Sequence, residues 1–100
     1  MTLDDYKSTL SFPVPPGGVQ GPLKALWLDA KGNWDEAHRL VQELPDRNAA
    51  WVHAYLHREE GDLGNASYWY HRAGKTVAGG DLETEWEKIA RALLRELTGR

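Results

Sequence analysis

The stretch NAAWVHAYLHREE, residues 48–60, decides the fold because its apolar side chains point in several directions around a helix. Three apolar pairs stand four positions apart, each on a different face: Ala50 with Ala54, Trp51 with Tyr55, and Val52 with Leu56. A helix with a single neighbour needs only one apolar stripe, so apolar residues on several faces predict neighbours on several sides. We therefore expect residues 48–60 to form a central helix around which the rest of the chain packs.

Helical patterns flank this stretch on both sides. Before it, one pattern runs from Pro22 to Lys31 and another from Asn33 to Leu44; after it, one runs from Leu63 to Ala73 and the last follows Asp81. Proline suits the first turn of a helix, and glycine suits the position just after its end. The last helix is strongly amphipathic, with an apolar face made by Leu82, Trp86, Ile89, Leu93 and Leu97. These periodicities predict an all-α fold of about five helices.

The N-terminal part of the chain has a different composition. Residues 11–18, SFPVPPGG, hold three of the five prolines, and proline disfavours the α region for the residue before it. We expect residues 1–21 to form an extended arm, in which residues 1–10 could carry a helical turn, and residues 22–100 to form one helical domain. A chain of 100 residues has room for a single hydrophobic core.

Composition excludes several classes of partner and site. The net charge is −3 with no basic half, so neither nucleic acid nor an anionic membrane surface is an expected partner. The absence of cysteine excludes disulfides, thiolate metal sites and cysteine nucleophiles. No apolar run is long enough to span a membrane and no secretory signal is visible, so we expect a cytoplasmic protein.

Sequence motifs for catalysis are missing as well. The tripeptide Gly74-Lys75-Thr76 matches the end of a phosphate-binding loop, but Trp69 occupies the position of the earlier glycine. No Ser-His-Asp order can be argued, and the paired glutamates neighbour basic residues on predicted solvated helices. We expect a protein that is not an enzyme and that carries no cofactor.

A weak internal repeat relates two parts of the helical region. Residues 32–37, GNWDEA, align with residues 61–66, GDLGNA, at a separation of 29 residues. The segment KGNWDEAHRLVQEL, residues 31–44, resembles the turn and second helix of tetratricopeptide-like repeats, and GDLGNASYWYHRAGK, residues 61–75, resembles their Sel1-type variant. The A-x-x-W-Y-x-x-A spacing of that variant is matched by Ala66, Trp69, Tyr70 and Ala73.

The resemblance covers residues 22–75 and implies two helix-turn-helix repeats stacked in a right-handed sense. Two repeats are fewer than the three that such arrays normally need to bury a continuous core. The arm and the last helix must then supply the missing cover, and the last helix is similar to the solvating helix that ends such arrays. The chain is also compatible with a small bacterial family in which this repeat is embedded.

The resemblance also implies a function. Repeats of this kind hold extended peptides on an inner face, which here would carry Trp51, Tyr55, Arg58 and Glu59 together with Leu26 and Asp29. We therefore expect a non-catalytic interaction module that binds a protein or peptide partner through these residues. A homodimer is also expected to be possible, because two repeats leave apolar surface uncovered. In the alternative, the final helix or a second copy of the chain fills the groove.

A pair of histidines provides the main alternative function. His53 and His57 stand one helical turn apart, so their imidazoles share a face and form a competent half of a metal site. A third ligand would come from Glu60, Asp62 or His71. The structural alternative is that both histidines make polar contacts between packed helices.

Overall fold

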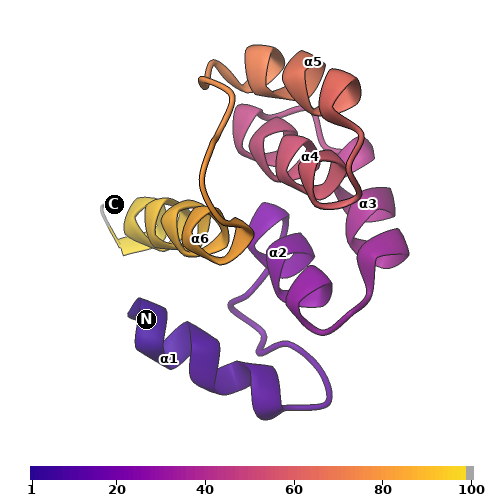
Figure 1. Cartoon of the computed structure of the whole chain (residues 1–100). Helices are drawn as coiled ribbons and strands as arrows, with labels where there is room; N and C mark the ends of the chain where they lie inside the picture. Colours follow the sequence, from indigo (N-terminus) through magenta and orange to yellow (C-terminus); the bar gives the residue numbers. More distant parts are fainter. Residues whose placement is uncertain (99–100) are drawn as a thin grey trace.

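The computed structural model describes residues 1–98, and all regular structure found in them is helical. The α-helices are α1 (Leu3–Ser8), α2 (Pro22–Ala30), α3 (Trp34–Gln42), α4 (Arg47–Glu59), α5 (Leu63–Ala73) and α6 (Leu82–Thr98), with a 3-10 turn at Thr9–Ser11 (Figure 1). The predicted all-α fold is confirmed. None of the helices in this part of the chain has the length and apolar character needed to cross a membrane.

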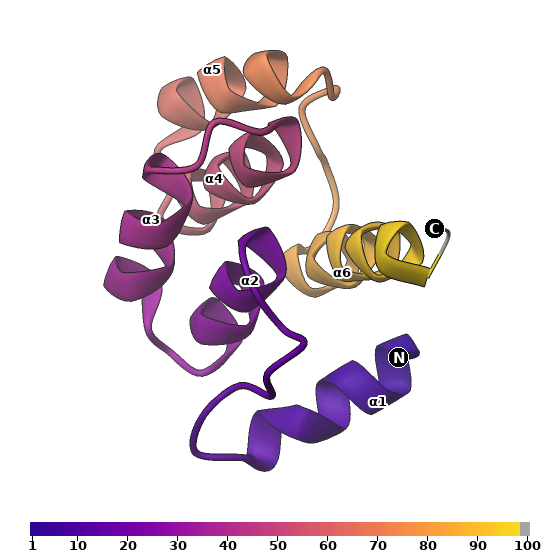
Figure 2. The same ribbon diagram turned by 180° about the vertical axis from the view of Figure 1, so that it is seen from behind.

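α4 is the central helix, as its sequence predicts. It contacts α2, α3, α5 and α6, and the views from front and back both place it among them (Figure 1, Figure 2). Every residue of α4 from Ala49 to His57 is buried. Because α4 has neighbours on several sides, it can bury apolar and polar side chains on opposite faces.

Two helix hairpins, α2–α3 and α4–α5, are joined by the same kind of turn. Gly32 and Gly61 follow the two first helices with φ of 88° and 87°, a left-handed conformation that favours glycine. The next backbone N–H in each case donates back to the first helix, from Asn33 to Leu28 and from Asp62 to His57, at 2.9 Å in both. These equal turns explain the internal repeat as a repeated hairpin.

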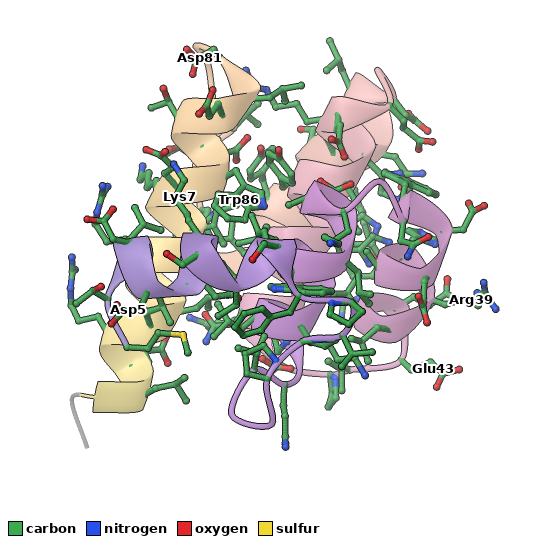
Figure 3. The ribbon with its side chains drawn as sticks, turned by 90° about the horizontal axis from the view of Figure 1, so that it is seen from below. Asp5, Lys7, Arg39, Glu43, Asp81 and Trp86 are labelled. Carbon is green, nitrogen blue, oxygen red and sulfur yellow. The ribbon has the colours of Figure 1, made fainter. Side chains whose placement is uncertain are left out.

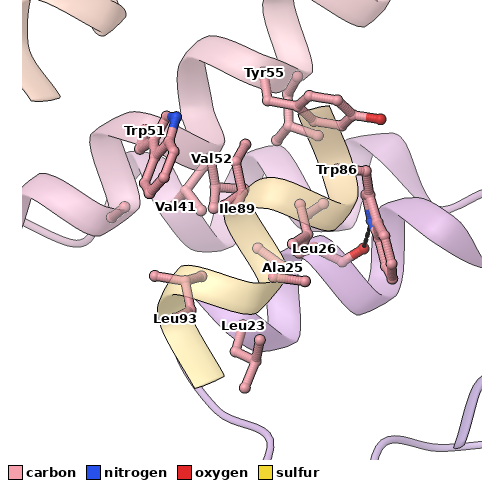
Figure 4. Packing of buried hydrophobic residues seen from close by; sticks show 14 of the residues in the cluster. Leu23, Ala25, Leu26, Val41, Trp51, Val52, Tyr55, Trp86, Ile89 and Leu93 are labelled. Carbon is pink, nitrogen blue, oxygen red and sulfur yellow. Dashed lines mark hydrogen bonds between the residues drawn. The ribbon is translucent and has the colours of Figure 1, made fainter. Parts of the chain in front are cut away.

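α6 closes the domain by lying across α2 and α4. Ile89 of α6 is fully buried near Val52 of α4, and the Trp86 indole N–H donates to the Leu26 carbonyl oxygen at 3.0 Å (Figure 4). The guanidinium of Arg58 binds the buried Glu85 carboxylate at 2.8 Å. α6 therefore contributes buried side chains to the hydrophobic core.

The first half of the N-terminal arm contains more helix than the single turn that the sequence allowed for. Residues 3–11 are helical, and a capping box between Thr2 and Asp5 begins α1. Tyr6 is fully buried and donates its hydroxyl proton to the Leu23 carbonyl oxygen at 2.7 Å, while Lys7 forms an ion pair with Glu87 at 2.7 Å. α1 thus crosses the outer side of α6 (Figure 3), because an aromatic anchor and one ion pair hold a helix that is too short to form alone.

Candidate functional site

Three imidazoles from two helices meet on the side of α4 that faces α3 and α5. His53 and His57 come from successive turns of α4, and His38 comes from α3. The Nε2 atoms of His38 and His53 lie 3.0 Å apart, and one ring nitrogen from each of the three histidines lies within 4.8 Å of the others. The histidine cluster, defined as His38, His53 and His57, brings three nitrogen donors to one point.

Two tryptophans form the walls of the histidine cluster. The indole of Trp34 stacks on His38 with ring centroids 4.8 Å apart and an interplanar angle of 8°. Trp69 of α5 stacks on His53 at 3.9 Å and 17°. The Trp34 N–H donates to the Leu56 carbonyl oxygen at 2.8 Å, so this wall is anchored to α4. Stacking from both sides restricts how the two imidazoles can turn.

The cluster disfavours the charged form of two of its imidazoles, His38 and His53. Burial, together with the neighbouring His38 and His57, lowers the pKa of His53 to about 4. Burial also lowers the pKa of His38, with His57 adding to the effect. His53 is only 3% exposed, and its Nδ1 atom is buried without a hydrogen-bond partner.

Glu60 orients the third imidazole. Its Oε1 atom lies 2.6 Å from Nδ1 of His57. An ionised carboxylate can only accept a hydrogen bond, so Nδ1 of His57 is the donor and Nε2 is the nitrogen left for an ion. The same carboxylate–imidazole arrangement supports metal-ligating histidines elsewhere, where it fixes the ring and raises its basicity.

The third ligand differs from those considered from the sequence. His38 of α3 joins the pair, whereas His71 is exposed on α5 and falls outside the groups that could share an ion. Asp62 lies near His57 and Glu60, but its carboxylate caps α5 by accepting from the Asn65 N–H at 3.2 Å. No spacing rule along one helix could have identified His38, because it depends on how α3 crosses α4.

α6 occupies much of the predicted partner-binding groove. Leu26 is fully buried, Trp51 is 6% exposed with Lys75 over its ring, and Arg58 is engaged by Glu85 of α6. α6 packs against Leu26 and lies close to Trp51 (Figure 4). These side chains stabilise the fold, and they present little surface to another molecule.

The remaining end of that groove is open. Asp29, Tyr55 and Glu59 line a depression of about 350 Å³, and its other walls are Lys7, Leu10, Ala30, Glu83, Trp86 and Glu87. Asp29 is 8% exposed and its carboxyl hydrogen-bonds to that of Glu59. Burial and the adjacent Asp29 raise the pKa of Glu59 to about 8, so this carboxyl pair, Asp29 with Glu59, holds a proton at neutral pH.

Comparison of the chain with protein-family models, with curated proteins and with solved structures finds no match. Function is therefore argued from the geometry of the histidine cluster and of the open depression.

Proposed function

We propose that the protein binds a divalent transition-metal ion through His38, His53 and His57. The observation that carries this proposal is the convergence of three ring nitrogens within 4.8 Å of one another in a largely buried, tryptophan-walled place. Neutral imidazoles suit Zn²⁺, Co²⁺, Ni²⁺ and Cu²⁺, whereas Mg²⁺ and Ca²⁺ require oxygen ligands. The first group is the class of ion that fits.

The spacing of the nitrogens fits one ion. Two imidazole nitrogens bound to zinc at about 2.0–2.1 Å in a tetrahedral site lie about 3.3 Å apart. The Nε2 atoms of His38 and His53 are 3.0 Å apart without an ion, so a small adjustment would bring both to a shared metal.

In the absence of an ion, the Nε2 atoms of His38 and His53 face each other at hydrogen-bond distance. Only one hydrogen can lie between the two Nε2 atoms, so one of them must donate to the other. An ion placed there would accept a lone pair from both Nε2 atoms. Because the pKa values of His38 and His53 are lowered, protons compete weakly with an ion for these two imidazoles.

The first experiment measures zinc binding by titration calorimetry on protein stripped with a chelator. We expect one ion per chain. The variants His38→Gln, His53→Gln and His57→Gln should each weaken binding by at least about 100-fold, since a three-ligand site depends on every donor. His71→Gln is the matched control, because His71 is exposed and outside the cluster, and it should bind as the parent does.

The outcome that contradicts the proposal is equally clear. Absence of binding, or an affinity that His38→Gln leaves unchanged, would remove the three-histidine site. Far-UV circular dichroism of each variant shows whether helicity survives. His38→Gln is the most informative of the three, because His38 is only half-buried and its replacement disturbs packing least.

Glu60 supplies a second, finer test of the same function. Because Glu60 contacts His57 on the nitrogen that faces away from the ion, it acts as a positioning residue. Glu60→Gln should weaken zinc binding about 10–100-fold, the usual effect of losing such a partner. Glu36→Gln, an exposed change on α3, should have no effect on affinity.

A second candidate function is protein interaction at the open depression. Its observation is the combination of the carboxyl pair with the aromatic walls Tyr55 and Trp86, which suits a basic side chain of a partner. An arginine-bearing peptide should bind more tightly than its citrulline counterpart, as measured by fluorescence anisotropy. Glu59→Gln should remove that difference, and equal binding of both peptides would contradict this function.

A further inference from the structure

The three histidines supply fewer ligands than a tetrahedral metal ion takes. Zinc-like ions in proteins take four, and sites with three protein ligands keep a water or a substrate in the fourth position. Among residues 1–98, the group of donors that could share an ion with His38 and His53 contains His57 and no fourth member. These side chains therefore supply three ligands to the proposed ion and leave its fourth coordination position open.

The nearest carboxylates are committed elsewhere. Glu60 lies against Nδ1 of His57, while the ion would bind Nε2, and the two nitrogens of one imidazole direct their lone pairs to different sides. Asp62 caps α5 through the Asn65 N–H. Drawing either acid to the ion would break a contact that the fold already uses.

The walls also exclude a further protein ligand. The faces of His38 and His53 are covered by Trp34 and Trp69, whose indole nitrogens donate hydrogen bonds and offer no lone pair to a metal. His38 is half-buried, so solvent reaches the histidine cluster from the α3 side.

Charge indicates which small molecule would bind. The three ligands are neutral imidazoles, so a divalent ion keeps its full double charge inside a largely buried site. Glu60, the nearest anion, compensates one unit through His57. A site with uncompensated positive charge and restricted access favours a small anion over a neutral ligand of similar size.

From these observations we propose that the metal ion keeps an open coordination position, which exchanges water for a small anion. This inference rests on the proposed function, since it requires the ion to be bound. It adds that the ion of this protein is a ligand-binding centre with an exchangeable position, in contrast to a closed structural site.

Cobalt substitution and azide provide the test. The metal-free protein is loaded with one equivalent of Co²⁺, and its visible absorption bands are recorded before and during titration with sodium azide. We expect bands typical of four-coordinate cobalt that shift with azide and saturate. Metal analysis after gel filtration should still give one cobalt per chain, which shows that azide adds to the ion and does not extract it.

The possible outcomes separate the two proposals. Cobalt bands that ignore azide would overturn the open position and leave the metal site intact. Absence of cobalt bands in the presence of folded protein would overturn both. Glu60→Gln distinguishes the roles of that residue: if Glu60 only positions His57, the azide shift persists in the variant, and a shift that appears only in the variant would show that Glu60 is the fourth ligand and overturn the inference.

Discussion

The two polar clusters of α4 make an instructive comparison. His53 and His57 face α3 and α5, whereas Glu59 faces the end of α2 and meets Asp29. Residues 57 and 59 lie about 200° apart around a helix, so the clusters occupy nearly opposite sides. Burial acts on both clusters, since it lowers the pKa of His53 and raises the pKa of Glu59.

The clusters reach neutrality by opposite routes. His38 and His53 have lowered pKa values and their Nε2 atoms share one hydrogen, while the carboxyl pair keeps a proton because the pKa of Glu59 is raised. Neutral imidazoles are ready to bind a cation, but a carboxyl pair must first release its proton. This difference is why the histidine cluster is the stronger candidate for a metal site.

The largest effect on the free energy of unfolding should come from replacing the tryptophan beside each cluster. Trp86 beside the carboxyl pair is 7% exposed, whereas Trp69 beside the histidines is half-buried. Trp86→Ala should lower the free energy of unfolding by about 3–5 kcal/mol, and Trp69→Ala by roughly half of that, because less apolar area is lost. Urea denaturation measures both, and an equal loss would contradict the different packing of the two sides.

The next effect is stabilisation by zinc, which should depend on the histidine cluster and not on the carboxyl pair. Zinc at a free concentration about 100 times its dissociation constant should raise the free energy of unfolding by about 2.7 kcal/mol. The same increment is expected for Glu59→Gln, because the carboxyl pair takes no part in binding. A loss of the increment in Glu59→Gln would show that the clusters are not independent, and its persistence in His53→Gln would show that His53 does not hold the ion.

Acid should lower the free energy of unfolding of the metal-free protein through His53. The unfolded chain protonates His53 near pH 6.5 and the folded protein only near pH 4, so the unfolded state binds more protons between these values. The free energy of unfolding should therefore fall as pH drops from 6.5 to 4. His53→Gln should reduce this slope in chemical denaturation with a chelator present; an unchanged slope would indicate that His53 titrates normally.

Alkali should produce the opposite and smallest effect at the carboxyl pair. The unfolded chain releases the Glu59 proton near pH 4.5 and the folded protein near pH 8, so stability is lost as pH rises through this window. Solvent screens the exposed Glu59, which reduces the size of the change. Relative to the parent, Glu59→Gln should gain stability with rising pH up to about pH 8, and a constant difference would contradict the shared proton.

The helical domain could be predicted from local signals. Pro22 begins α2, and the apolar residues around the third predicted helix correctly place α4 at the centre. Periodicity succeeds here because each of these helices has a strong apolar pattern and a clear breaker at its end.

α1 and His38 could not be predicted in the same way. α1 has only six residues, and it exists because Tyr6 inserts between α2 and α6, a contact that depends on the tertiary fold. In the sequence pattern, His38 lies on the polar face of its helix. Only the crossing of α3 over α4 brings its ring to His53. The filled groove has the same origin, since the docking of α6 depends on Trp86 and Glu85 reaching partners on other helices.

The most direct test of the central claim follows the histidine ring nitrogens by ¹⁵N–¹H correlation spectroscopy while metal-free protein is titrated with zinc. The account predicts that the signals of His38, His53 and His57 change together and are complete at one equivalent, while His71 keeps its metal-free signal. If any of the three retains its original signal at saturation, the ion is not held by the histidine cluster as described.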